Sequence, residues 1–120
     1  MADFVLGPVE AKFADLIWAN EPLGSGELVK LAAAALGWKK STTYTVLKKL
    51  CARGIFKNDN GTVTSLVSRG DLAADAGETF VREVFDGSLP AFVAAFTSKK
   101  RLSPEEVAEL RRLVDEMEGD

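Results

Sequence analysis

The spacing of apolar side chains divides the chain into amphipathic segments separated by short polar connections. Gly7-Pro8 marks the start of the first segment, because proline suits the first position of a helix. Apolar residues then recur at helical spacing, at Val9, Phe13, Leu16 and Ile17. This pattern predicts a first helix with one buried face.

Two more helices are expected before residue 54. Ser25 is the expected N-cap of the second, which Gly37 ends. The third runs from Lys39 to Arg53, and Gly54 ends it. Its apolar side carries Val46, Leu47, Leu50 and Cys51, while hydroxyl and lysine side chains occupy the opposite side. Three such helices with short connections predict a helix-turn-helix, with the third as recognition helix.

A strong turn signal follows the third helix. Asn60-Gly61 lies between short runs rich in Val, Ile, Phe and Thr, which indicates a small β-hairpin. A hairpin after three helices is the wing of a winged helix. The expected fold is therefore mainly α, with a winged helix-turn-helix DNA-binding domain of three helices and a short hairpin in residues 1–70.

Residues 71–120 have a helical and acidic character. Gly87 separates two of the expected helices, and Ser88 caps the second of them. Ser103, Pro104 and Glu106 form the clearest helix start in the chain, a capping box with proline at the first position. The apolar stripes of these short helices need a partner surface, which favours a second copy of the chain. We expect a helical dimerisation domain whose interface includes Phe85, Leu89, Phe92, Val93, Phe96, Val107, Leu110, Leu113, Val114 and Met117.

The net charge of −3 conceals an uneven distribution. Residues 1–70 contain nine Lys or Arg and six Asp or Glu, whereas residues 71–120 contain six and twelve. Six cations and no acid lie between residues 39 and 57. A solvated charged helix would explain this composition equally well, but a basic patch of this kind also indicates contact with a polyanion.

Several classes of function are disfavoured. The chain has no histidine and one cysteine, so the common general base, histidine nucleophile pairs and thiolate metal clusters are ruled out. The phosphate-binding glycine motifs are also missing. The apolar runs are shorter than a membrane span, and the N-terminus lacks a secretory pattern. We therefore expect a cytoplasmic protein without enzymatic activity, metal or cofactor, and without a membrane partner.

The motifs taken together resemble one family of regulators. They are Trp18 near the end of the first helix, the pattern W-x-x-S-T-x-Y-T-x-L-x-x-L-x-x-x-G in residues 38–54, GSL in residues 87–89 and LSPEE in residues 102–106. With this order and spacing, the chain is similar to the BlaI/MecI/CopY family of winged-helix transcriptional regulators over residues 9–113. The resemblance implies a homodimeric repressor whose winged helix binds a palindromic operator and whose C-terminal helices form the dimer interface.

The resemblance also places the DNA contacts. The DNA-facing start of the third helix, with candidate base contacts, falls on Lys40, Ser41, Thr42 and Thr45. The candidate phosphate contacts are Lys39, Tyr44, Lys48, Lys49, Arg53 and Lys57. For Tyr44, packing into the domain is an equal alternative to bonding a phosphate.

Three features depart from the family pattern. The wing segment NGTVTSLVS lacks the usual arginine and aromatic residues, and the Cys-x-Cys motif of copper-responsive members is absent. The Asn-Phe bond at which a sensor protease cleaves some members is Ala95-Phe96 here, so a sensor protease is an expected partner only through the resemblance. The short wing also leaves open an alternative function, a winged-helix module that binds proteins and has no specific operator.

Overall fold

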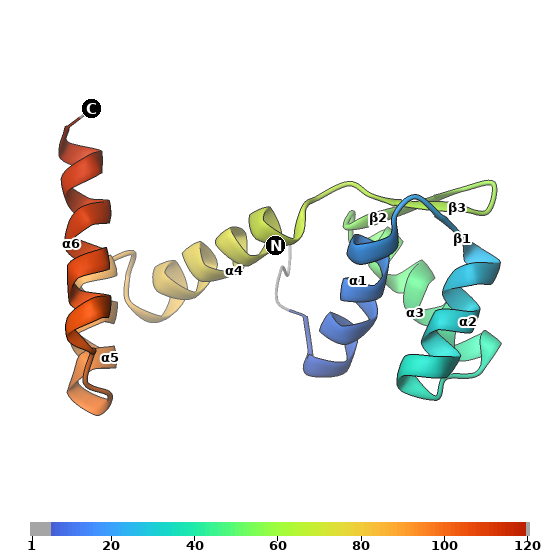
Figure 1. The fold of residues 1–120 in the computed structure, drawn as a ribbon, viewed down its shortest axis with the longest axis horizontal. Helices are drawn as coiled ribbons and strands as arrows, with labels where there is room; N and C mark the ends of the chain where they lie inside the picture. Colours follow the sequence, from blue (N-terminus) through green and yellow to red (C-terminus); the bar gives the residue numbers. More distant parts are fainter. Residues whose placement is uncertain (1–5, 120) are drawn as a thin grey trace. The chain divides into compact units, whose positions relative to one another are not determined.

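The computed structural model describes residues 6–119, which form six helices and three short strands (Figure 1). In chain order these are α1 (Pro8–Asn20), β1 (Leu23–Gly24), α2 (Ser25–Leu36), α3 (Lys40–Ala52), β2 (Phe56–Asp59), β3 (Thr62–Ser65), α4 (Arg69–Val84), α5 (Leu89–Lys99) and α6 (Pro104–Glu118). The chain divides into two compact units, Met1–Glu78 and Thr79–Asp120. The N-terminus, on which the expectation about secretion rests, lies outside the described residues.

The first unit is a winged helix, as the sequence predicts. Helices α1, α2 and α3 pack on one another and on the small sheet. They enclose a core whose largest fully buried side chains are Phe13, Ile17, Leu28, Thr43, Leu50, Ile55, Phe56 and Val63. The expected buried face of α1 was wrong at Val9, which is 53% exposed. Val9 lies in the first turn, one turn before Phe13, and the buried part of α1 also includes Ala14.

The hairpin forms at the predicted turn. Strands β2 and β3 are antiparallel, with Asp59 opposite Thr62, and the two connecting residues have positive φ angles of 52° at Asn60 and 89° at Gly61. Positive φ at both positions defines the type I′ turn that matches the twist of a hairpin. Strand β1 was not predicted. It pairs with the other edge of β3, so the strand order is β1-β3-β2.

The tip of the hairpin is held against the start of α2. The backbone N–H of Ser25 donates to the carbonyl oxygen of Gly61 at 2.7 Å, and the N–H of Gly61 donates to Oδ1 of Asn58 at 3.0 Å. The prediction that Ser25 is the N-cap was wrong, because the helix starts at Ser25 and Gly24 is the N-cap. The N–H of Ser25 instead donates to Gly61 in the wing, and its hydroxyl oxygen accepts a hydrogen bond from Tyr44.

Both tryptophans are anchored on the core. The ring of Trp18 packs on Phe56 with centroids 5.2 Å apart, and its Nε1–H donates to the carbonyl oxygen of Val67 at 3.0 Å. Trp38 packs on Phe13 with centroids 5.0 Å apart. The hydrogen bond from Trp18 to Val67 ties the segment that follows the wing to α1.

The end of the wing and the start of α4 are also tied to the winged helix. The Glu21 carboxylate accepts hydrogen bonds from the backbone N–H and the hydroxyl of Ser65, each at 2.8 Å. Arg69 forms an ion pair with Asp15 at 2.8 Å, and Leu72 is buried in the core of the first unit. Helix α4 thus begins two residues before the change in composition and contributes to this core.

In the second unit, phenylalanine rings join α4 to α5. Phe80, Phe85 and Phe92 contact one another with centroids 5.5 to 6.0 Å apart. The Ser88 hydroxyl caps α5 by accepting the N–H of Ala91 at 3.1 Å, as predicted. The capping box at the start of α6 is confirmed as well, with reciprocal hydrogen bonds of 3.1 Å between Ser103 and Glu106.

Candidate nucleic-acid interface

Helix α3 buries one side and exposes the other. Thr43, Leu47 and Leu50 are buried in the core, and the candidate base contacts Lys40, Ser41, Thr42 and Thr45 are all exposed. The hydroxyl of Thr43 is satisfied within the helix, since it donates to the carbonyl oxygen of Lys39 at 3.1 Å. The face that the sequence assigns to DNA is therefore open to solvent, and its hydroxyl-bearing residues lie at the start of the helix.

The candidate phosphate contacts surround this face. Lys39, Lys48, Lys49 and Lys57 are exposed, whereas Arg53 is half-buried. Lys39 precedes the first turn of α3, Lys48 and Lys49 lie near its end, and Lys57 lies on β2, which packs beside α3. The structure thus brings β2, with Lys57 and the exposed Asp59, beside the lysine-bearing helix α3, which itself has no acid.

Tyr44 has a partner inside the domain. Its ring is half-buried against the core, and its hydroxyl donates to Oγ of Ser25 at 3.2 Å. Tyr44 thus packs into the domain, and its contact with a phosphate stays a prediction. The hydroxyl also connects α3 to the residue that holds the tip of the wing.

Sequence reasoning missed a hollow between α3 and β2. It has a volume of about 310 Å³ and is lined by Tyr44, Leu47, Lys48, Cys51 and Asn58. Burial raises the pKa of the Cys51 thiol, and a hydrogen bond to the backbone of Asn58 partly opposes that shift. No sequence signal points to this site, because its residues come together only when β2 packs on α3.

Across residues 6–119, no group of three or more His, Cys, Asp or Glu side chains could hold a metal ion. No helix within the same range has both the length and the apolar character that crossing a bilayer requires.

The second unit presents an apolar surface. Among the described residues of α5 and α6, none is buried. The residues expected at the dimer interface include Leu89, Phe96 and Leu113, which are 58%, 44% and 41% exposed, and the exposed fraction of Met117 is 73%. Apolar surface of this extent is unusual on a monomer and is typical of a surface that binds another protein.

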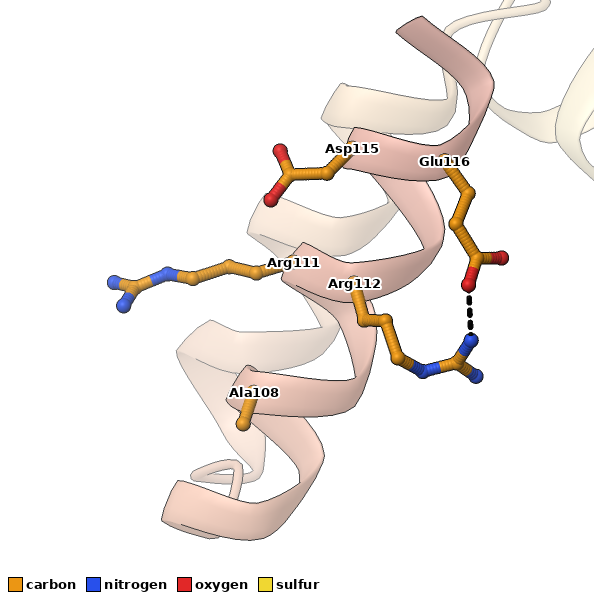
Figure 2. A pocket seen from close by; sticks show the side chains of 5 residues that line it. All are labelled: Ala108, Arg111, Arg112, Asp115 and Glu116. Carbon is orange, nitrogen blue, oxygen red and sulfur yellow. Dashed lines mark hydrogen bonds and ion pairs between the residues drawn. The ribbon is translucent and has the colours of Figure 1, made fainter. Parts of the chain in front are cut away.

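Helix α6 separates its apolar side from a charged side. Leu110, Leu113 and Val114 are exposed on the first. A shallow groove there is lined by Leu102, Val107, Leu110 and Val114, with Arg111 and Asp115 at its charged edge. Figure 2 shows the opposite side, where Arg112 is joined to Glu116 by an ion pair of 2.5 Å and Arg111 points away from that pair. Arg112 also pairs with Glu109, so this arginine is satisfied within the helix.

Comparison with known proteins assigns this architecture. The sequence profile of the penicillinase repressor family matches residues 6–116, which is most of the chain. The chain belongs to the penicillinase repressor family. The methicillin resistance regulatory protein MecI of Staphylococcus aureus strain Mu50 is 24% identical to it over 116 residues, which cover 93% of this chain and 94% of that protein. The penicillinase repressor of Bacillus licheniformis is 24% identical over 115 residues, which cover 92% of this chain and 90% of that protein.

Membership of the penicillinase repressor family confirms the resemblance seen in the sequence. It identifies the chain as a transcriptional repressor of the BlaI/MecI type, in a family of regulators rather than enzymes. The match spans both units, so the exposed face of α3 and the apolar helices of the second unit belong to one regulatory protein. The dipeptide Ala95-Phe96 lies inside α5, the helix that the sequence predicts after Ser88.

Proposed function

We propose that this repressor binds a specific palindromic operator in double-stranded DNA as a homodimer in the cytoplasm. Residues 1–70 bind the DNA, and residues 71–120 form the dimer. The observation that carries the proposal is the exposed side of α3, where lysines and hydroxyl groups lie together without an acid while the other side is buried in the domain. A helix of this kind fits the major groove of B-DNA.

The two kinds of side chain have different roles in this proposal. Exposed lysines such as Lys48 and Lys49 neutralise phosphates and supply affinity that falls with salt. The short hydroxyl side chains of Ser41, Thr42 and Thr45 allow the helix to approach closely and reach base edges, which supply specificity. Lys40 is the remaining candidate for base contact.

The dimer follows from the apolar surface of the second unit. A two-fold dimer buries the same patch on both copies, and the stripe of α6 offers such a patch on one side of a single helix. Two recognition helices related by a two-fold axis then require a palindromic operator, with half-sites about one helical turn of DNA apart or a multiple of that.

A sensor protease is the less favoured partner. The resemblance supplies the only support for it, and the chain has Ala95-Phe96 where cleavable members have Asn-Phe. In this protein the bond lies within the hydrogen-bonded helix α5, which would have to unfold locally before a protease could bind the chain in an extended form.

The test is a fluorescence anisotropy titration of the purified protein with the promoter of its own gene, at two salt concentrations. We expect one inverted repeat to bind about a thousandfold or more tightly than a scrambled duplex of the same composition. Equal weak binding to both duplexes would refute the claim of a specific operator.

The hydrogen bond between the tip of the wing and α2 favours one alternative function, a module that binds proteins rather than DNA. With Gly61 bonded to Ser25, the tip does not extend freely from the domain. Charge reversal of Lys48 and Lys49 to glutamate separates the two functions. Loss of DNA binding by a variant that still forms the dimer supports the repressor, and unchanged DNA affinity supports the alternative.

A further inference from the structure

The hollow between α3 and β2 has the size and the lining of a small-ligand site. Its volume of about 310 Å³ falls at the lower end of the range of roughly 300–1,000 Å³ that such sites occupy. It is formed by two elements that pack directly on each other, so its walls are held by the core of the domain.

One wall of the hollow is apolar. Leu47 is buried, and Tyr44 and Cys51 are half-buried at its sides. The hydroxyl of Tyr44 donates to Ser25, so towards a ligand this residue offers its ring rather than its proton. An aromatic ring packs well against such a wall, because offset or edge contacts between rings are favourable.

The polar groups of the hollow are donors. Lys48 is exposed at the edge and carries an ammonium group. Oδ1 of Asn58 already accepts the N–H of Gly61, which leaves the NH₂ group of Asn58 as its free donor. None of the five residues that line the hollow is acidic, so its lining favours an anion that has two acceptor oxygens.

We propose that this hollow binds a small aromatic carboxylate, with its ring against Tyr44 and Leu47 and its carboxylate paired with Lys48. The apolar wall distinguishes this ligand from a DNA phosphate, which would leave the wall uncovered. The binding itself depends only on the hollow. Its regulatory consequence rests on the proposed function, because a ligand that pairs with Lys48 competes with DNA for the same ammonium group and thereby acts as an inducer.

The reactivity of Cys51 reports whether the hollow is occupied, since Cys51 is the only cysteine of the chain and lines the hollow. Its rate of reaction with a disulfide reagent is followed while benzoate is added to the purified protein without DNA. We expect benzoate to slow the reaction saturably. Benzamide has the same ring without the charge, and we expect it to bind about tenfold or more weakly.

Two matched variants show whether Lys48 is responsible. Lys48→Met keeps the length of the side chain and removes its charge, and we expect it to weaken protection by benzoate about tenfold or more. Lys49→Met removes the same charge from the next residue, which does not line the hollow, and we expect its affinity for benzoate to stay within about twofold of the original. Equal losses in the two variants would show a general effect of charge and overturn the proposal.

Three further results of the benzoate and DNA titrations would decide whether the hollow binds the ligand. Absence of saturable protection up to about 10 mM benzoate overturns the proposal, as does protection by duplex DNA in the absence of any protection by benzoate. In the second case the hollow serves the DNA backbone, and the proposed function is supported while the ligand is rejected. Protection by benzoate in a protein that does not bind DNA would instead support the site and reject the repressor function proposed above.

Discussion

Replacement of Lys48 and Lys49 by glutamine should reduce the salt dependence of DNA binding. Both lysines are exposed on the outer side of α3, and neither contributes to the core. A dimer of the variant lacks four cations in total. Each phosphate contact contributes about 0.9 to the slope of log affinity against log salt, so the slope should fall by about 3.6 if all four lysines contact phosphates.

The consequence is large enough to measure directly. When the salt concentration rises fourfold, the affinity of each protein for DNA falls by some factor. With a difference of about 3.6 in slope, this factor is about 150 times smaller for the variant than for the original protein. The assay is anisotropy with a labelled duplex between about 50 and 200 mM salt. Thermal unfolding monitored by circular dichroism should change little, since exposed substitutions usually alter stability by less than about 0.5 kcal/mol.

The control variant also replaces two exposed lysines by glutamine, but outside α3. Lys99 and Lys100 lie at the end of α5, and both are exposed. Their replacement by glutamine should leave the slope unchanged if α3 binds the DNA. An unchanged slope in the Lys48 and Lys49 variant, or equal reductions in both variants, would refute the assignment of α3 as the DNA-binding helix.

Three further predictions concern stability and assembly. Trp18→Phe removes the hydrogen bond to Val67 and leaves its carbonyl oxygen without that donor, so urea titration should show a free energy of unfolding about 1–3 kcal/mol lower. Gly61→Ala places a side chain at a φ angle of 89°, where an added Cβ meets only Oγ of Ser25 at 3.8 Å. The cost is therefore backbone strain of about 1–2 kcal/mol, visible as a lower melting temperature. Leu113→Glu puts a charge on the apolar stripe of α6, and sedimentation velocity should show a monomer that keeps its helical content.

The elements that local signals define were predictable from the sequence. The start of α6 has its capping serine, its proline and its glutamate within four residues, and all three act as expected. The Asn60-Gly61 turn is equally local, because its two residues tolerate the positive φ angles that it requires. The buried and exposed sides of α3 also followed from its 3.6-residue period.

The features that depend on distant partners were not predictable. Strand β1 has two residues and exists because Leu23 and Gly24 pair with β3, which is about forty residues away in the chain. Ser25 has the right chemistry for an N-cap, but it is the first residue of α2, and its N–H donates to Gly61 of the distant wing. The hollow beside α3 likewise depends on how β2 packs. The partner of the α6 stripe lies outside a single chain, so the stripe predicts that a partner is needed and gives no detail of the contact.

The charged side of α6 has a practical consequence for handling the protein. Arg112 pairs with Glu109 and Glu116 on its own helix, so these charges are satisfied without a second subunit. The proposed subunit contact then depends on apolar burial, which excluded salts such as sulfate strengthen, whereas phosphate contacts weaken as ionic strength rises. A wash at high sulfate concentration should therefore strip nucleic acid from the purified protein while its quaternary structure stays intact.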